Sequence, residues 1–570
     1  MTPIKTIALS LLFATTLSLS PVAAREISLS GNFLASRSAA LSRDNQAAAT
    51  FLGAALQQDP GNPNMIERLF QIELANGNLP AAEKLAGEVI EFNSQHRMAR
   101  IVLAMQEFAA RRYDKAREHL AESNYTPAGE LTATLLSAWS YAGEASLNAA
   151  LTELDKLDAN ESFANFKNFH AALIADYLNS SIRAEVFYKK AYQDAGSSLR
   201  VTQSYGSFLE RNNRPDEARK IYEAFLAGGE SNSLVEASLK RLGTGEKAAS
   251  LIATPPAGAG EALFSLAAAM NDDQGIDTAL LFAQLALNFS DDKPVMLTLL
   301  GDIFSTSRNY ELANAAYGKI ALNSPLRIHA DTEIAVNLQR LDRGKESIEQ
   351  LRSIVARDPT NYAVWVTLGS VYRSTDEYAK ATEAYDAALK LVAKPERSHW
   401  TVFYFRGIAN ERLKKWPLAE VDFRKALELA PDESSVLNYL GYSLIDKNEK
   451  LDEAIAMVKK AVELKPNDGY IVDSLGWAYY QLRDFANAVE QLERAVDLKA
   501  GDPIIAEHLG DAYWRVGRTL EAKFQWQHAK DNKPEPDDLK RIEGKLKDGM
   551  PELPPLVKPA DNSGTGSSNG

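Results

Sequence analysis

Apolar and polar positions alternate along most of the chain with the spacing of amphipathic helices. In the C-terminal half, large apolar residues recur at three- and four-residue steps, as in Trp365, Leu368 and Tyr372, which places them on one face of a helix. The pattern stops near prolines such as Pro359 and Pro395, because proline does not continue a helix. We therefore predict two amphipathic helices between one such proline and the next.

Small residues mark a repeat in the same part of the chain. Each unit has one glycine on its first predicted helix and two alanines on its second, and successive glycines are 34–38 residues apart. The five sets are Gly369, Ala381 and Ala388; Gly407, Ala419 and Ala426; Gly441, Ala454 and Ala461; Gly476, Ala488 and Ala495; and Gly510, Ala522 and Ala529. Because these residues lack bulk, the paired helices can approach closely while larger neighbours interlock around them.

The unit resembles the tetratricopeptide repeat. The signature positions of that family are occupied together by Trp365, Leu368, Gly369, Tyr372, Ala381, Tyr385, Ala388 and Pro395. The register continues upstream through Gly301 and Gly206, and about 13 units of this period fit the chain. The resemblance implies an all-α, right-handed superhelical solenoid of antiparallel helix pairs, with its function on the concave face.

Residues 1–24 have the layout of a secretory signal. A cation at Lys5 precedes an apolar stretch, and small residues end at Ala24. No later segment reaches the roughly 18 uninterrupted apolar residues of a membrane-spanning helix. The chain has no Cys for disulfides or N-terminal lipid attachment. We expect export to the periplasm, cleavage after Ala24 and no transmembrane segment.

Composition predicts a break inside the array. Residues 253–260 read ATPPAGAG, which we do not expect to continue a helix. Between 128 and 198 the helical pattern persists with few signature residues, so repeat boundaries there stay open. The predicted parts are a signal peptide at 1–24, a degenerate N-terminal solenoid at 25–250, a linker at 251–260, a C-terminal array at 261–536, a capping helix at 537–550 and a disordered tail at 551–570.

Charge and the scatter of reactive residues argue against several functions. A formal net charge of −13 disfavours nucleic-acid binding, which needs a basic surface. The seven His have no pair at the four-residue spacing of a helical zinc site, and His508 and His528 have no carboxylate motif beside them. The G-x-S-x-G string at 566–570 lacks the strand–turn–helix context of a nucleophile. We expect no enzyme, metal or cofactor.

Candidate partner-binding residues lie on the first helix of each unit, beside the packing positions. The resemblance places the concave surface there. The projected residues are Tyr404, Asn438, Tyr442, Tyr470, Asp473, Trp477, Tyr480, Glu507, Asp511, Trp514 and Arg515. Aromatic rings surrounded by charged and amide groups are typical of an interaction hot spot. A structural alternative is that Trp477, Tyr480 and Trp514 pack against the next repeat or the C-terminal helix.

The last repeats are similar to the ends of exported tetratricopeptide-repeat proteins of Gram-negative envelopes, including adaptors of carboxyl-terminal processing proteases. The similar stretches are LNYLGYSLID, DSLGWAYYQLRDFANAVEQLERAVDL and HLGDAYWRVGRTLEAKFQW. The resemblance implies a non-catalytic scaffold or adaptor for protein partners, such as a periplasmic protease or an envelope assembly factor. Unlike the lipoprotein adaptors, this chain has no Cys. Glycan or peptidoglycan binding is the alternative function, and self-association into a homo-oligomer also stays open.

Overall fold

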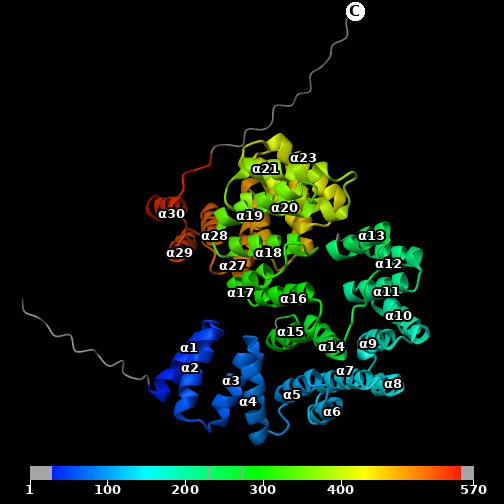
Figure 1. The fold of residues 1–570 in the computed structure, drawn as a ribbon. Helices are drawn as coiled ribbons and strands as arrows, with labels where there is room; N and C mark the ends of the chain where they lie inside the picture. Colours follow the sequence, from blue (N-terminus) through cyan, green and yellow to red (C-terminus); the bar gives the residue numbers. More distant parts are fainter. Residues whose placement is uncertain (1–27, 197, 228–231, 273, 554–570) are drawn as a thin grey trace, which may run out of the picture. The chain divides into compact units, whose positions relative to one another are not determined.

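The computed structural model describes residues 28–553 except 197, 228–231 and 273 (Figure 1). The predicted signal peptide at 1–24 and residues 554–570 of the predicted tail lie outside the described residues. The chain divides into two compact units, with the boundary between Ser347 and Ile348. In the described ranges, all regular elements are helices, so the predicted all-α fold is confirmed.

The first unit consists of helices that pair with their neighbours in sequence. They are α1 (Leu29–Leu41), α2 (Asn45–Gln58), α3 (Pro63–Ala75), α4 (Leu79–Phe92), α5 (Arg97–Ala109), α6 (Tyr113–Ala121), α7 (Pro127–Gly143), α8 (Leu147–Leu154), η1 (Asp155–Ala159), η2 (Glu161–Phe163), α9 (Ala164–Tyr177), α10 (Ser181–Ala195), α11 (Leu199–Arg211), α12 (Pro215–Ala227), α13 (Ser233–Thr244), α14 (Pro255–Ala269), α15 (Ile276–Phe289), α16 (Lys293–Thr306), α17 (Tyr310–Gly318) and α18 (Arg327–Arg340).

The second unit is a more regular array. Its helices are α20 (Tyr362–Ser374), α21 (Tyr378–Lys390), η3 (Arg397–His399), α22 (Trp400–Arg412), α23 (Trp416–Leu429), α24 (Ser434–Asp446), α25 (Leu451–Leu464), α26 (Gly469–Gln481), α27 (Phe485–Leu498), α28 (Pro503–Arg515), α29 (Thr519–Asp531) and α30 (Pro536–Asp548). The remaining helix, α19 (Gly344–Arg357), crosses the boundary between the units.

The α20–α21 pair shows why this sequence forms helix pairs. The side chain of Asn361 accepts a hydrogen bond from the Val364 N–H and caps the start of α20. Within the pair, Gly369 faces the Tyr385 ring so closely that a Cβ would lie 2.6 Å from Cε1. Tyr385 is fully buried. The glycine therefore makes room for the aromatic ring that joins the two helices.

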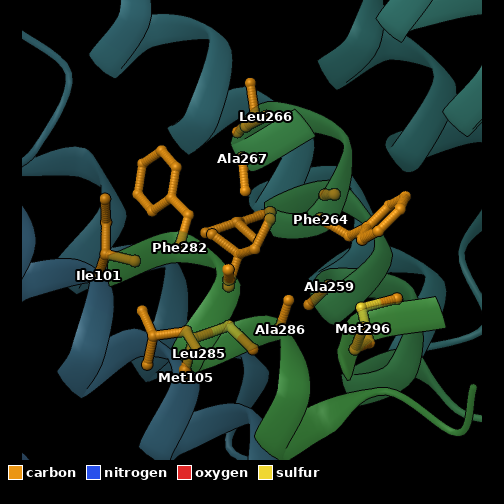
Figure 2. Packing of buried hydrophobic residues seen from close by; sticks show 14 of the residues in the cluster. Ile101, Met105, Ala259, Phe264, Leu266, Ala267, Phe282, Leu285, Ala286 and Met296 are labelled. Atoms are coloured by element: carbon orange, nitrogen blue, oxygen red, sulfur yellow. The ribbon is translucent and has the colours of Figure 1, made fainter. Parts of the chain in front are cut away.

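In the first unit, α14 and α15 pack against helices from much earlier in the chain. α14 contacts α5, α7 and α9, and α15 contacts α3. The Nε2 of Gln284 donates to the carbonyl of Ala75 at 2.8 Å, across 209 residues of sequence. Figure 2 shows Ile101 and Met105 of α5 in one apolar cluster with Phe282 of α15. The helices that α14 and α15 meet are the first members of their pairs, so the face they form is covered.

The predicted linker at 251–260 is wrong from Pro255 onward. Thr254 caps α14, its Oγ1 accepting from the Ala257 N–H at 3.3 Å. The prolines fall in the first turn, where a missing N–H costs nothing. Gly258 is buried, and a Cβ there would overlap the Trp139 ring. The small residues that we interpreted as a break instead allow α14 to lie close against α7. The boundary between the compact units lies farther on, at 347/348.

Candidate partner-binding surface

The first helices of the pairs in the second unit form the candidate surface. α20 contacts α22, α24 contacts α26, and α26 contacts α28. We call the surface made by α20, α22, α24, α26 and α28 the inner face. All eleven projected residues lie on four of these helices. Their surroundings differ between the α28 end and the α22–α24 part.

At the α28 end, the two projected carboxylates are paired with cations of α30. Arg541 donates through Nε and Nη2 to the two carboxylate oxygens of Glu507, both at 2.6 Å. Lys545 Nζ lies 2.7 Å from Glu507 and 2.6 Å from Asp511. The carboxylates are buried, with Glu507 1% and Asp511 3% exposed. While α30 is in place, a partner does not reach them.

Burial and the α30 cations act in opposite directions on these carboxylates. Burial opposes ionisation of Glu507, but Arg541 and Lys545 outweigh it and hold its pKa below the ordinary value. At Asp511 burial is the larger effect, and the pKa is raised despite Lys545. Trp526 also donates its indole N–H to Asp511, at 2.9 Å. The carboxylates therefore depend on α30 and α29 for their compensation.

Trp514 and Arg515 hold the chain that follows α30. The indole N–H of Trp514 donates to the Met550 carbonyl at 3.2 Å, and Gly549 lies against its ring. Arg515 donates to the Tyr480 hydroxyl at 3.1 Å and to the Pro551 carbonyl at 2.7 Å. Trp514 therefore packs against the C-terminal segment, as in the structural alternative given for it in the sequence analysis.

Trp477 lies in a stack of three rings. Its ring centroid is 4.6 Å from that of Tyr480, at an interplanar angle of 7°, and 4.0 Å from that of His508, at 18°. The indole of Trp477 is therefore stacked on two neighbouring rings. His508 Nδ1 is 2.9 Å from an oxygen of Asp473. Asp473 lies 35 residues before His508, which is why no carboxylate motif beside the histidine indicated this pair.

The His508–Asp473 pair predicts that the stability of the second unit depends on pH. Burial disfavours the charged imidazole, but Asp473, with Asp511 and Glu507 as lesser contributors, raises the pKa of His508 above 6.5. A raised histidine pKa stabilises the fold fully below the unfolded value and stops doing so as the pH rises through the folded value. We expect the melting temperature of the second unit to fall with pH above about 6.5.

Thermal unfolding followed by tryptophan fluorescence measures the pH dependence of this melting temperature, because six of the seven Trp belong to the second unit. His508→Gln is expected to flatten the pH profile above pH 6.5. Parallel profiles for the wild type and His508→Gln would contradict the assignment.

The remaining projected residues lie on α22, α24 and the start of α26. Tyr404, Asn438 and Tyr442 are half-buried, and Tyr470 is 54% exposed. Burial, with Asp473 and Asp446 nearby, raises the pKa of Tyr442 to about 12, so its hydroxyl stays a hydrogen-bond donor. The principal contacts of α22 and α24 are with their neighbours in the array. No helix from outside the array is thus among the principal contacts of this α22–α24 surface, although Tyr404 itself packs on Phe423 and Tyr439.

Two further side chains contribute to the α22–α24 surface and were not projected from the sequence. Tyr439 meets Tyr404 edge to face at 6.0 Å and lies 3.3 Å from Glu411 through its hydroxyl. Arg373 of α20 stacks on Phe405, with 4.5 Å from its guanidinium carbon to the ring centroid. Arg373 follows Gly369 by four residues, the register position of Tyr480 and Trp514, but only the last four repeats were projected. Tyr439 lies next to the projected Asn438 and is outside the projected register positions.

The described residues also lack two features found in other kinds of protein. They contain no cluster of three His, Asp or Glu side chains arranged to hold a metal ion. Within the same ranges, no helix combines the length and the apolar character needed to cross a bilayer.

Comparison with known families finds tetratricopeptide repeats in both units. Models of this repeat match residues 39–105, 332–397, 366–434, 436–468 and 474–528. A TPR repeat-containing protein of Pseudomonas aeruginosa is 27% identical over 180 residues, which are 31% of this chain and 29% of the relative. The general transcriptional corepressor ssn6 of Schizosaccharomyces pombe is 25% identical over 150 residues, 26% of this chain and 13% of the relative. The matches therefore span less than a third of either relative.

Solved structures of helical repeat proteins are also similar. The APC/C hetero-tetramer Cut9-Hcn1 aligns with a TM-score of 0.38 and 16% identity over 90% of this chain and 95% of the solved chain. A tetratricopeptide repeat protein from Parabacteroides merdae aligns with a TM-score of 0.37 and 18% identity, over 44% of this chain and 96% of the solved chain.

Proposed function

We propose that this chain, a tetratricopeptide-repeat protein, is a non-catalytic scaffold that holds a partner protein on the α22–α24 surface. In this proposal it acts in the periplasm, after cleavage of residues 1–24, as an adaptor for an envelope protease or an assembly factor. The observation that carries the proposal is that no helix from outside the array is among the principal contacts of this surface. The matching surface of α28 is occupied by α30, and in the first unit α14 and α15 cover α3, α5, α7 and α9.

The chemistry of the α22–α24 surface suits a polypeptide. Tyr404 and Tyr442 offer rigid contact area at a low cost in side-chain entropy. The Asn438 side chain is half-buried and carries an amide, a group that can both donate and accept hydrogen bonds. Arg412 and Asp446 are exposed at the margin. Aromatic contacts with a charged margin are typical of protein interfaces.

The glycan alternative has less support. Sugar rings stack on open aromatic faces, and Trp477 is one of the projected aromatic residues. Its ring is stacked on those of Tyr480 and His508. Trp514 is likewise engaged by Gly549 and Met550. The described inner face therefore favours a protein partner over a glycan.

Alanine substitution tests the proposed surface. We expect Tyr404→Ala combined with Tyr442→Ala to weaken the partner complex by about 2 kcal/mol or more, roughly 30-fold, because buried aromatic anchors dominate interface energy. The measurement is quantitative pull-down from envelope extract with the chain from Arg25 onward as bait, followed by titration of the recovered partner.

The matched control changes exposed apolar residues on α23, the second helix of the pair that contains Tyr404. Leu418→Ser with Val421→Ser alters α23, where both side chains are exposed, and is expected to leave recovery unchanged. Equal recovery by all three baits would place the binding site elsewhere. Recovery of peptidoglycan fragments and no protein would favour the glycan alternative.

A further inference from the structure

α30 packs on α29, and its cations reach across to the carboxylates of α28. Glu507 and Asp511 are four residues apart on α28, and the cations that meet them, Arg541 and Lys545, are four residues apart on α30. Ile542, next to Arg541, is fully buried in the apolar cluster of the last repeats. The recognition pattern of this contact is therefore two cations four residues apart, with an apolar residue next to the first. We call it the α30 pattern.

Covering the end of an array does not require this chemistry. A cap needs apolar side chains to shield the last pair from water, and Ile542 and Leu546 supply them. In addition, α30 meets α28 through two almost fully buried carboxylates. Removing a carboxylate from water costs several kcal/mol before its partner repays it. Replacing a buried ion pair by well-packed apolar side chains is often neutral or stabilising, so shielding the last pair does not account for these charges. The α28 surface is thus built to recognise a particular helix.

α30 is also held in a way that allows it to separate from α28. Ile542 is the single fully buried side chain along the helix, and Arg541 is 48% exposed. An isolated helix of this length is marginal in water, and terminal elements open at the lowest free-energy cost in a structure. Trp514 and Arg515 hold the following segment through its backbone carbonyls, and any polypeptide offers such acceptors.

We propose that the α28 surface formed by Glu507, Asp511 and Trp514 is a second protein-binding site, which α30 occupies in the free protein. Its ligand is an amphipathic helix of a partner protein that carries two cations four residues apart and an apolar residue next to the first. The inference rests on the proposed scaffold function but uses a surface separate from Tyr404 and Tyr442. A partner helix replaces α30 by taking over its ion pairs and its apolar contact.

A labelled peptide of residues 536–553 serves as the probe, with the full chain as receptor. In the wild type, α30 competes at a high effective concentration because it is tethered. Arg541→Ala with Lys545→Ala in the receptor weakens that competition. We expect the peptide to bind this variant at least about 10-fold more tightly than the wild type. Fluorescence anisotropy measures the affinity, and circular dichroism verifies that the variant keeps its helix content.

Two controls test the α30 pattern and the carboxylates that it meets. A peptide in which Lys545 and Asp548 are exchanged has the same composition and keeps Ile542 and Leu546 in place. It lacks the four-residue spacing of the cations and is expected to lose binding. Adding Glu507→Gln and Asp511→Asn to the receptor variant is expected to abolish binding of the original peptide. Equal binding of the original and exchanged peptides, or no binding by a folded receptor variant, would overturn the proposal.

A receptor variant with Tyr404→Ala and Tyr442→Ala separates this site from the first. It is expected to bind the peptide with unchanged affinity even though partner recovery through the α22–α24 surface is lost. Loss of peptide binding in this variant would mean that the α28 site is not separate and would overturn the proposal. Failure of the pull-down alone would count only against the α22–α24 surface.

Discussion

Replacing Arg200 with methionine is expected to lower the free energy of unfolding of the first unit by about 3–5 kcal/mol, because it leaves a buried carboxylate without its partner. Arg200 of α11 donates through Nε and Nη2 to Glu261 of α14, at 2.9 and 2.6 Å, and through Nη1 to Asp292 at 2.8 Å. Glu261 is only 1% exposed. The substitution therefore breaks the ionic contact that joins α11 to α14.

Urea unfolding measures this effect, with the indole N–H resonance of Trp139 as the reporter. Trp139 is the single Trp in the sequence of the first unit. Arg200→Met combined with Glu261→Leu removes both charges and is expected to recover most of the loss. Arg343→Met, which breaks the exposed pair with Glu346, is expected to change stability by less than about 0.5 kcal/mol. Similar losses for Arg200→Met and Arg343→Met would contradict the assignment.

Trp139→Ala is expected to destabilise the first unit by about 3–5 kcal/mol, since it empties a fully buried site. The ring supports Gly258 of α14, and its indole N–H donates to Nδ1 of His170 at 3.1 Å. His170 is fully buried, and burial lowers its pKa to about 3, so it is a neutral acceptor. The variant therefore loses packing and also leaves this acceptor without its donor.

Thermal unfolding followed by far-ultraviolet circular dichroism measures the Trp139→Ala effect. Trp416→Ala in the second unit is the matched control. Trp416 is half-buried and its indole N–H donates to Glu449 at 3.3 Å on an exposed surface. We expect this control to cost less than about 1.5 kcal/mol. A Trp139→Ala protein as stable as the control would show that α14 does not depend on α7.

The helix pairs could be predicted because the signal for them is local. Gly369, Ala381 and Tyr385 lie within one repeat, and their sizes alone indicate which faces meet. The same reasoning failed at Pro255 because proline both ends helices and starts them. Periodicity also carries no information on contacts between distant repeats. The packing of α15 on α3 depends on Gln284 and Ala75, which no repeat register relates.

The candidate site could be predicted only in part for a similar reason. The projection assigned the candidate residues to the first helices of the pairs, but it treated every inner surface as equally open. Glu507 and Asp511 are covered because α30 carries cations at a matching spacing. Asp473 is engaged because His508 follows it one repeat later. Such pairings depend on the side chains of adjacent repeats together, whereas a projection considers each repeat alone.

The packing of α14 and α15 on the early helices gives the first unit a folding problem that a simple solenoid lacks. In a solenoid each repeat can fold on its predecessor as the chain emerges. Here the apolar surface around Ile101 and Trp139 is completed only when residues 255–289 arrive. Contacts of such long sequence separation slow folding and prolong the exposure of apolar surface. We therefore expect the nascent first unit to depend on a chaperone until α15 has been made.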